Sequence, residues 1–169
     1  VLDGVISPGE WEAAARTTGF VGLNDPTLVE DQTSVYVGHD ARNLYVAFDC
    51  TDPLQRPLQA VHTQRDAAVY QEDAVDIFLQ PGPGTYPYYQ LAANCIGTRF
   101  DLRVVEEGGR RVHDLNWNPD WSVATSRQLG RWVAEVAIPW AELGGAPRPG
   151  ERWRVNFCRN YYYRLPGQP

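Results

Sequence analysis

Asp76 lies in a stretch where acidic and aromatic residues alternate with apolar ones. Residues 70–79 read YQEDAVDIFL. In a β-strand successive side chains point to opposite sides, so Asp76 and Phe78 would share one face and the aliphatic residues between them the other. The aliphatic face suits a core. Asp76 therefore faces water, a structural partner or a ligand.

Residues of the common catalytic types are present without catalytic spacing. His39, His62 and His113 form no HExxH motif and no arrangement with the cysteines that suggests zinc. No serine lies in a G-x-S-x-G motif, and no glycine-rich turn has the lysine and helix of a phosphate-binding loop. Glu72 and Asp73 are adjacent, so in a strand they cannot flank one glycosidic bond. We therefore predict that the chain is not an enzyme.

Aromatic residues are abundant, with six tryptophans, nine tyrosines and five phenylalanines. Some belong to predicted strands, whereas Tyr70, Tyr86 and Trp117 stand in loop sequence near polar residues. An aromatic ring can stack on the apolar face of a sugar while planar polar side chains hydrogen-bond its hydroxyls. Alternatively, each ring caps an end of the fold. Taken together they favour a carbohydrate-binding site.

The positions of the predicted elements indicate an all-β chain. SPGE at residues 7–10 is a capping box with proline at the first helical position, and it predicts one short helix over residues 8–16. Residues 53–72 have no clean period and are expected to form a long surface excursion. A two-residue period, typical of strands, marks residues 33–40, 43–50, 73–80, 88–95, 98–105, 121–127, 131–139 and 152–160. We predict an antiparallel β-sandwich of two sheets, jelly-roll-like, with one short N-terminal helix.

The same alternation assigns residues to the core, and the predicted core residues include Val75, Ile77, Val136, Ile138, Val155 and Phe157. Glu135 interrupts an apolar strand on the face opposite its neighbours, and we expect it to pair with Arg103 or Arg154 on a neighbouring strand. Two interpretations stay open for Cys50, Cys95 and Cys158: three free thiols, or one Cys50–Cys95 disulfide.

Charge and length restrict the partners. The net charge is -6 and the pI about 5.0, which argues against binding to nucleic acid or anionic membranes. No apolar run approaches the length of a membrane-spanning helix, so we expect no membrane insertion. The 169 residues correspond to one domain with room for a core.

Five motifs in series resemble the family-nine carbohydrate-binding modules and their DOMON-like relatives. They are LDGVISPGEW, HDARNLYVAFDCTDP, EDAVDIFL, GRWVAEVAIPWAEL and GERWRVNFCRN, spread in order over nearly the whole chain. The resemblance implies a DOMON-like sandwich of two antiparallel sheets and noncatalytic binding of a polysaccharide or oligosaccharide. It also implies attachment to the catalytic domain of a parent polypeptide that degrades polysaccharides, in a bacterial, secreted, extracellular or periplasmic setting.

The resemblance further assigns site residues. Tyr70 takes the place of the family's stacking aromatic residue, and Asp76 that of the acid that hydrogen-bonds sugar hydroxyls. Where the family has an arginine and a glutamine, this chain has Ala92 and Cys158, while Asn160 keeps the family's asparagine. The expected sugar-binding residues are Tyr70, Asp76, Gln90, Asn94, Asn160 and Tyr162.

Further expectations follow from the same resemblance. The family's second stacking tryptophan follows its late strand, so residues 1–169 are expected to form a single domain that lacks the closing C-terminal strand. No cofactor is required, and structural calcium is possible. Candidate calcium ligands are Asp40, Asp49, Asp52 and Asp73, for each of which turn capping is the ordinary role.

Two other functions suit the same fold. One is a haem-binding DOMON-type electron-transfer domain, which resembles cytochrome b carriers with methionine and histidine as axial ligands. The chain has no methionine, so such a site would need two of His39, His62 and His113 to converge. The other is a structural or interaction domain without a sugar ligand.

Overall fold

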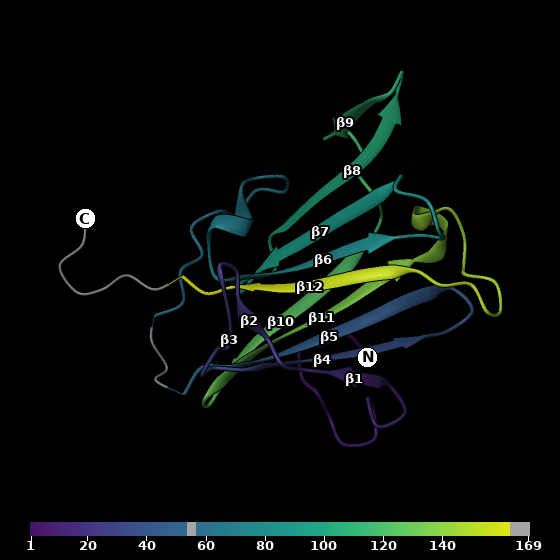
Figure 1. Cartoon of the computed structure of the whole chain (residues 1–169). Coiled ribbons are helices and arrows are strands. Elements are labelled where there is room, and N and C mark those ends of the chain that lie inside the picture. Colours follow the sequence, from purple (N-terminus) through teal and green to yellow (C-terminus); the bar gives the residue numbers. More distant parts are fainter. Residues whose placement is uncertain (54–56, 163–169) are drawn as a thin grey trace.

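Two antiparallel sheets of five strands face each other in the computed structural model, which describes residues 1–53 and 57–162 (Figure 1). The order of the first sheet is β1 (Ala15–Thr17), β4 (Thr33–His39), β5 (Asn43–Thr51), β11 (Arg131–Pro139) and β10 (Ser122–Gln128). The order of the second is β12 (Arg154–Asn160), β6 (Ala74–Gln80), β7 (Tyr88–Asn94), β8 (Arg99–Glu107) and β9 (Arg110–Asp114). The predicted antiparallel β-sandwich is confirmed.

All eight predicted strands are present within one or two residues of their expected bounds. The sequence reading missed β1, β9 and a small ribbon of β2 (Val21–Gly22) and β3 (Asp25–Leu28). Two short 3-10 helices complete the described elements, η1 (Val69–Gln71) and η2 (Trp140–Leu143). None of the described helices has the length and apolar character needed to cross a membrane.

The predicted helix over residues 8–16 is absent, and the chain there forms turns that lead into β1. Part of the capping box does form, because the Glu10 carboxylate accepts a hydrogen bond from the Ser7 N–H at 3.3 Å. The segment is short for a stable helix. The indole of Trp11 is also engaged elsewhere, since it donates to Glu135 at 2.8 Å.

The core between the sheets follows the predicted alternation at most positions. Val75, Ile77, Val136 and Ile138 are all buried, and Phe157 is half-buried with its ring edge-on to Phe48 at 5.8 Å. The prediction for Val155 is wrong, because 49% of it is exposed. Within the described residues β12 is the outermost strand of its sheet, so nothing on its far side covers Val155.

Glu135 anchors the N-terminal segment instead of forming the predicted ion pair. Its buried carboxylate accepts from the backbone N–H groups of Asp3 and Gly4 at 3.0 and 2.9 Å, as well as from Trp11. Gly4 lies so close to β10 that a Cβ would come within 2.7 Å of the Thr125 carbonyl carbon. Both proposed arginine partners belong to the second sheet, whereas Glu135 lies on the far side of the first. The pairing prediction is therefore wrong.

The three cysteines are free thiols. Burial raises the pKa of Cys50 to about 12 and that of Cys95 to about 11. Both thiols therefore remain protonated and poorly reactive at neutral pH.

Candidate functional site

The face of the second sheet that points away from the first sheet, which we call the outer face, carries Asp76. Asp76 lies opposite Ala92 of β7 and Cys158 of β12. Phe78, two residues along β6, lies opposite Gln90 and Asn156 of the same two strands. Because these residues alternate with core positions, their side chains gather on the outer face.

Asp76 is only 3% exposed, and each oxygen of its carboxylate accepts a hydrogen bond. Gln90 Nε2 donates to Oδ1 at 2.7 Å, and Asn160 Nδ2 donates to Oδ2 at 2.6 Å. Burial raises the pKa of Asp76, and the bonds from Gln90 and Asn160 offset only part of that rise. The carboxylate therefore joins three neighbouring strands into one polar cluster, which we call the Asp76 cluster (Asp76, Gln90 and Asn160).

The charge of Asp76 also fixes how the two amides are turned. An ionised carboxylate only accepts hydrogen bonds, so both amides must direct their NH2 groups at it. The carbonyl oxygens of Gln90 and Asn160 then point away from Asp76. Both side chains are half-buried. The Asp76 cluster consequently offers acceptors to a ligand that brings hydroxyl donors.

The raised pKa of Asp76 leads to a testable pH dependence. The folded state takes up the proton at higher pH than the unfolded chain, so ionised Asp76 costs stability that is recovered as the pH falls. The difference in unfolding free energy between wild type and Asp76→Asn should therefore shift in favour of wild type between about pH 7 and about pH 4. Urea unfolding of both proteins across this range measures the shift. A change in the opposite direction would contradict the assignment.

Two aromatic rings, of Tyr70 and Phe100, pack together beside this cluster at one end of the outer face. Tyr70, in η1, is 39% exposed and its ring lies edge-on to Phe100 of β8 at 5.1 Å. Its neighbour Val69 is fully buried and packs in the hydrophobic cluster of β7 and β8, which holds η1 against the sheet. The described part of the excursion that carries η1, residues 57–72, lies on the outside of the second sheet (Figure 1). Tyr70 therefore combines a fixed base with an accessible ring.

A buried carboxylate holds this excursion in place. Glu72 accepts hydrogen bonds from the N–H groups of Val61 and His62 at 2.6 and 3.0 Å and from the His62 ring at 2.8 Å. It also accepts from Asn94 Nδ2 at 2.9 Å. Burial by itself raises the pKa of Glu72, but the bonds from Asn94, Val61 and His62 together hold that pKa below its usual value.

Asn94 belongs to this structural network, in disagreement with its expected role as a sugar-binding residue. Its side chain is completely buried. The amide donates to Glu72 and to the His62 carbonyl oxygen, and the side-chain oxygen accepts from the N–H groups of Ile96 and Thr98. Asn94 shares the parity of Gln90, but it lies where the excursion folds over the end of β7, so no surface remains for a ligand.

Tyr162 and Trp117, two further aromatic residues considered from the sequence, lie on different parts of the fold. Tyr162 comes just after β12, is half-buried, and donates its backbone N–H to Asp73 Oδ1 at 3.1 Å. It thus stays near the Asn160 end of the outer face. Trp117 packs on Tyr89 at 4.8 Å against the core, so it does not contribute to the outer face.

The outer face has one polar side and one apolar side. A second hydrophobic cluster covers β7 and β8, and the Asp76 cluster spans β12, β6 and β7. A pyranose has the same division between an apolar ring face and polar edges. The apolar cluster comprises Val69, Ala92, Phe100, Leu102 and Val104, with Tyr86 and Tyr88 packed against it. Sequence reasoning missed Phe100 and Tyr88 as members of this face, although their parity with Ala92 and Gln90 would have indicated them.

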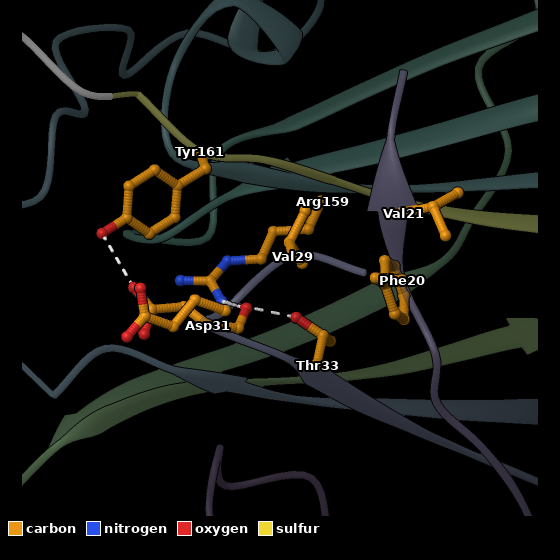
Figure 2. Close-up of a pocket in the computed structure, with 8 residues that line it drawn as sticks. Phe20, Val21, Val29, Asp31, Thr33, Arg159 and Tyr161 are labelled. Atoms are coloured by element: carbon orange, nitrogen blue, oxygen red, sulfur yellow. Dashed lines mark hydrogen bonds between the residues drawn. The ribbon is translucent and has the colours of Figure 1, made fainter. Parts of the chain in front are cut away.

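A separate pocket of about 280 Å³ opens at the edge of the sandwich, on the core side of β12 (Figure 2). Arg159 crosses it and donates through one nitrogen to the Thr51 carbonyl at 2.8 Å and to Thr33 Oγ1 at 3.4 Å. The guanidinium also stacks on Tyr161 at 4.9 Å, and the Tyr161 hydroxyl donates to Asp31 at 3.2 Å. Because Arg159 ties β12 to the ends of β4 and β5, we assign it a structural role.

The four candidate calcium ligands do not converge. Asp40 caps the β4–β5 turn by accepting from the N–H groups of Arg42 and Asn43, both at 2.7 Å. Asp49 pairs with Arg131 and Asp52 with Arg127, and Asp73 accepts from backbone N–H groups. Across residues 1–53 and 57–162 no cluster of three or more His, Cys, Asp or Glu side chains could hold a metal ion.

The histidines lie on separate parts of the fold. His39 ends β4 in the first sheet, where its ring meets Trp140, and His113 lies in β9 at the far edge of the second sheet. His62 is engaged by Glu72 in the excursion. This arrangement gives no support to the bis-histidine haem site considered from the sequence.

A sandwich whose outer face combines aromatic rings with oriented planar polar groups has the form of a β-sandwich binding module. The family model described as "Carbohydrate family 9 binding domain-like" matches residues 2–161. The chain belongs to this family. A comparison with curated protein sequences gave no match.

Solved structures share the fold at low sequence identity. One is a family 9 carbohydrate binding module from Caldicellulosiruptor kristjanssonii in complex with cellotriose, with TM-score 0.63, 17% identity and coverage of 93% of this chain and 70% of that one. A putative carbohydrate-binding protein from Bacteroides uniformis has TM-score 0.63, 18% identity and coverage of 85% and 70%. A family 9 module from Caldicellulosiruptor kristjanssonii in complex with glucose has TM-score 0.55, 16% identity and coverage of 82% and 63%.

Proposed function

We propose that this chain is a noncatalytic carbohydrate-binding module whose ligand binds on the outer face of the second sheet. The observation that carries the proposal is the Asp76 cluster, with its amide oxygens turned outward beside the accessible ring of Tyr70. The ring would stack on the apolar face of a sugar unit, and the amide oxygens would accept from its hydroxyls. Tyr162 is proposed to line the Asn160 end of the same site.

Family membership supports a carbohydrate as the ligand, and structures of similar fold contain cellotriose and glucose. β-Linked glucose oligosaccharides are therefore the first ligands to test. We further propose that the module is attached to the catalytic domain of a polysaccharide-degrading enzyme and acts in the extracellular space or periplasm. A binding module in that position would hold the enzyme close to its insoluble substrate.

Alanine variants of Tyr70 and Asp76 test the function. Tyr70→Ala removes the stacking ring, and stacking contributes roughly 0.5–1.5 kcal/mol beyond area burial. Asp76→Ala removes the carboxylate that turns the Gln90 and Asn160 oxygens toward the ligand. Each variant should therefore weaken binding by about tenfold, enough to abolish retardation on affinity gels that contain β-glucans. Circular dichroism should remain native.

Tyr36→Ala is the matched control, because Tyr36 is a half-buried tyrosine on β4 of the other sheet. Its retardation should equal that of wild type. If wild-type protein binds none of a broad panel of polysaccharides and oligosaccharides, the proposed function is wrong and an interaction domain without a sugar ligand becomes the better interpretation.

A further inference from the structure

A second depression, of about 190 Å³, lies on the outer face farther along β6 from the Asp76 cluster. It is lined by Phe78, Leu79 and Gln80 of β6, Tyr88 of β7, and Arg154, Val155 and Asn156 of β12. Three adjacent strands thus supply aromatic rings and planar polar groups to one hollow. This is the same combination of side chains that surrounds Asp76.

The depression adjoins the Asp76 cluster directly. Phe78 follows Asp76 by two residues on the same face, a separation of about 7 Å along a strand. Gln90, which donates to Asp76, lies opposite Phe78 on β7. A short oligosaccharide lying along β6 would therefore reach both places without a change of direction.

The polar groups of the depression complement those of the Asp76 cluster. The exposed Arg154 donates through one nitrogen to Gln80 Oε1 and to the Gly84 carbonyl oxygen, both at 3.3 Å. A guanidinium has five N–H groups, so donors remain for a ligand. Asn156, also exposed, adds an amide whose Nδ2 donates one hydrogen bond to Cys158 Sγ at 3.3 Å and keeps a second N–H. The depression thus presents donors where the Asp76 cluster presents acceptors.

We propose that this depression is a second sugar subsite, so that the module binds an oligosaccharide chain along β6 and not a single sugar unit. The inference rests on the proposed function of the Asp76 cluster. In the second subsite Phe78 stacks on a further sugar ring, and Arg154 and Asn156 donate to its hydroxyl and ring oxygens.

Calorimetric titration with glucose, cellobiose, cellotriose and cellotetraose tests the subsite. Wild-type affinity should rise by about tenfold from glucose to the longest oligosaccharide. Phe78→Ala and Arg154→Ala should each remove most of this rise and leave glucose affinity within about twofold of wild type. Arg154 is exposed, so its variant keeps the test valid even if Phe78→Ala disturbs folding. Arg42→Ala, an exposed arginine in the β4–β5 turn, should bind like wild type.

The outcomes separate this inference from the proposed function. Equal affinity for all four sugars, or equal losses on glucose and cellotetraose in Arg154→Ala, would reject the second subsite and leave the Asp76 site standing. Failure of wild type to bind any member of the series would reject the proposed β-glucan ligand together with the subsite.

Discussion

Replacement of Glu135 by alanine should lower the free energy of unfolding by about 2–4 kcal/mol. The buried carboxylate accepts three hydrogen bonds, from the backbone of Asp3 and Gly4 and from the indole of Trp11. Hydrogen bonds that involve a charged group are worth more than neutral ones, and donors left buried without a partner are costly. The N-terminal segment would lose its anchor on the first sheet.

Urea unfolding gives the change in free energy, and limited proteolysis checks that the N-terminal segment is released. Glu106→Ala is the matched control, because Glu106 is an exposed strand glutamate in β8. Glu135→Gln should give an intermediate loss, since an amide cannot accept from donors on both sides. If Glu135→Ala proves as mild as Glu106→Ala, the anchoring role is wrong.

Removal of the Glu72 carboxylate is expected to have an effect of similar size and to weaken ligand binding as well. Glu72→Ala breaks four hydrogen bonds that hold the excursion on the outer face, which should cost about 3 kcal/mol or more. Tyr70 is two residues away in η1, so its ring should lose its fixed position. Sugar affinity should then fall by about tenfold, although Glu72 touches no ligand.

Unfolding curves, amide exchange at Val61 and His62, and calorimetric titration measure these effects together. Glu30→Ala, which replaces an exposed glutamate, serves as the control.

The stabilisation by Glu72 should also depend on pH. The pKa of Glu72 lies below its ordinary value, so the stabilisation that Glu72 gives is present above the unfolded-state pKa and is lost as the pH falls through the folded-state pKa. Rapid exchange at both amides in the wild type would contradict the proposed anchoring.

Alternation along the chain was enough to predict the eight longer central strands, because burial on one face imposes a two-residue period on the sequence. It missed β1, β2, β3 and β9, which are short and mostly exposed. It failed where a residue's neighbours come from distant parts of the chain. Val155 has core parity but lies on an outermost strand, and the acceptor that captures Trp11 is Glu135, more than a hundred residues later. The capping box predicted a helix over residues 8–16, which is wrong: the Ser7–Glu10 hydrogen bond forms, but the chain turns into β1 instead of continuing as a helix.

The candidate site was predictable to a similar degree. Parity with two core residues placed Asp76 on the outer face, and the family resemblance selected Gln90 and Asn160, which the structure brings to its carboxylate. Asn94 has the same parity, but only the course of the excursion reveals that it is buried. Sequence alone also cannot say which atoms of the two amides face outward, because that depends on their contact with a charge.

The position of β12 at the margin of the second sheet would couple ligand binding at the proposed site to the docking of this strand. This strand supplies Asn160 and Asn156, yet among the described strands it pairs only with β6. A sugar bound across β12 and β6 would bind only when β12 is docked. Its binding free energy would therefore stabilise the docked state and make fraying of β12 rarer. Affinity and the closing of the sandwich would then be two readouts of one equilibrium, and a nascent chain would acquire its ligand site only when residue 160 had been made.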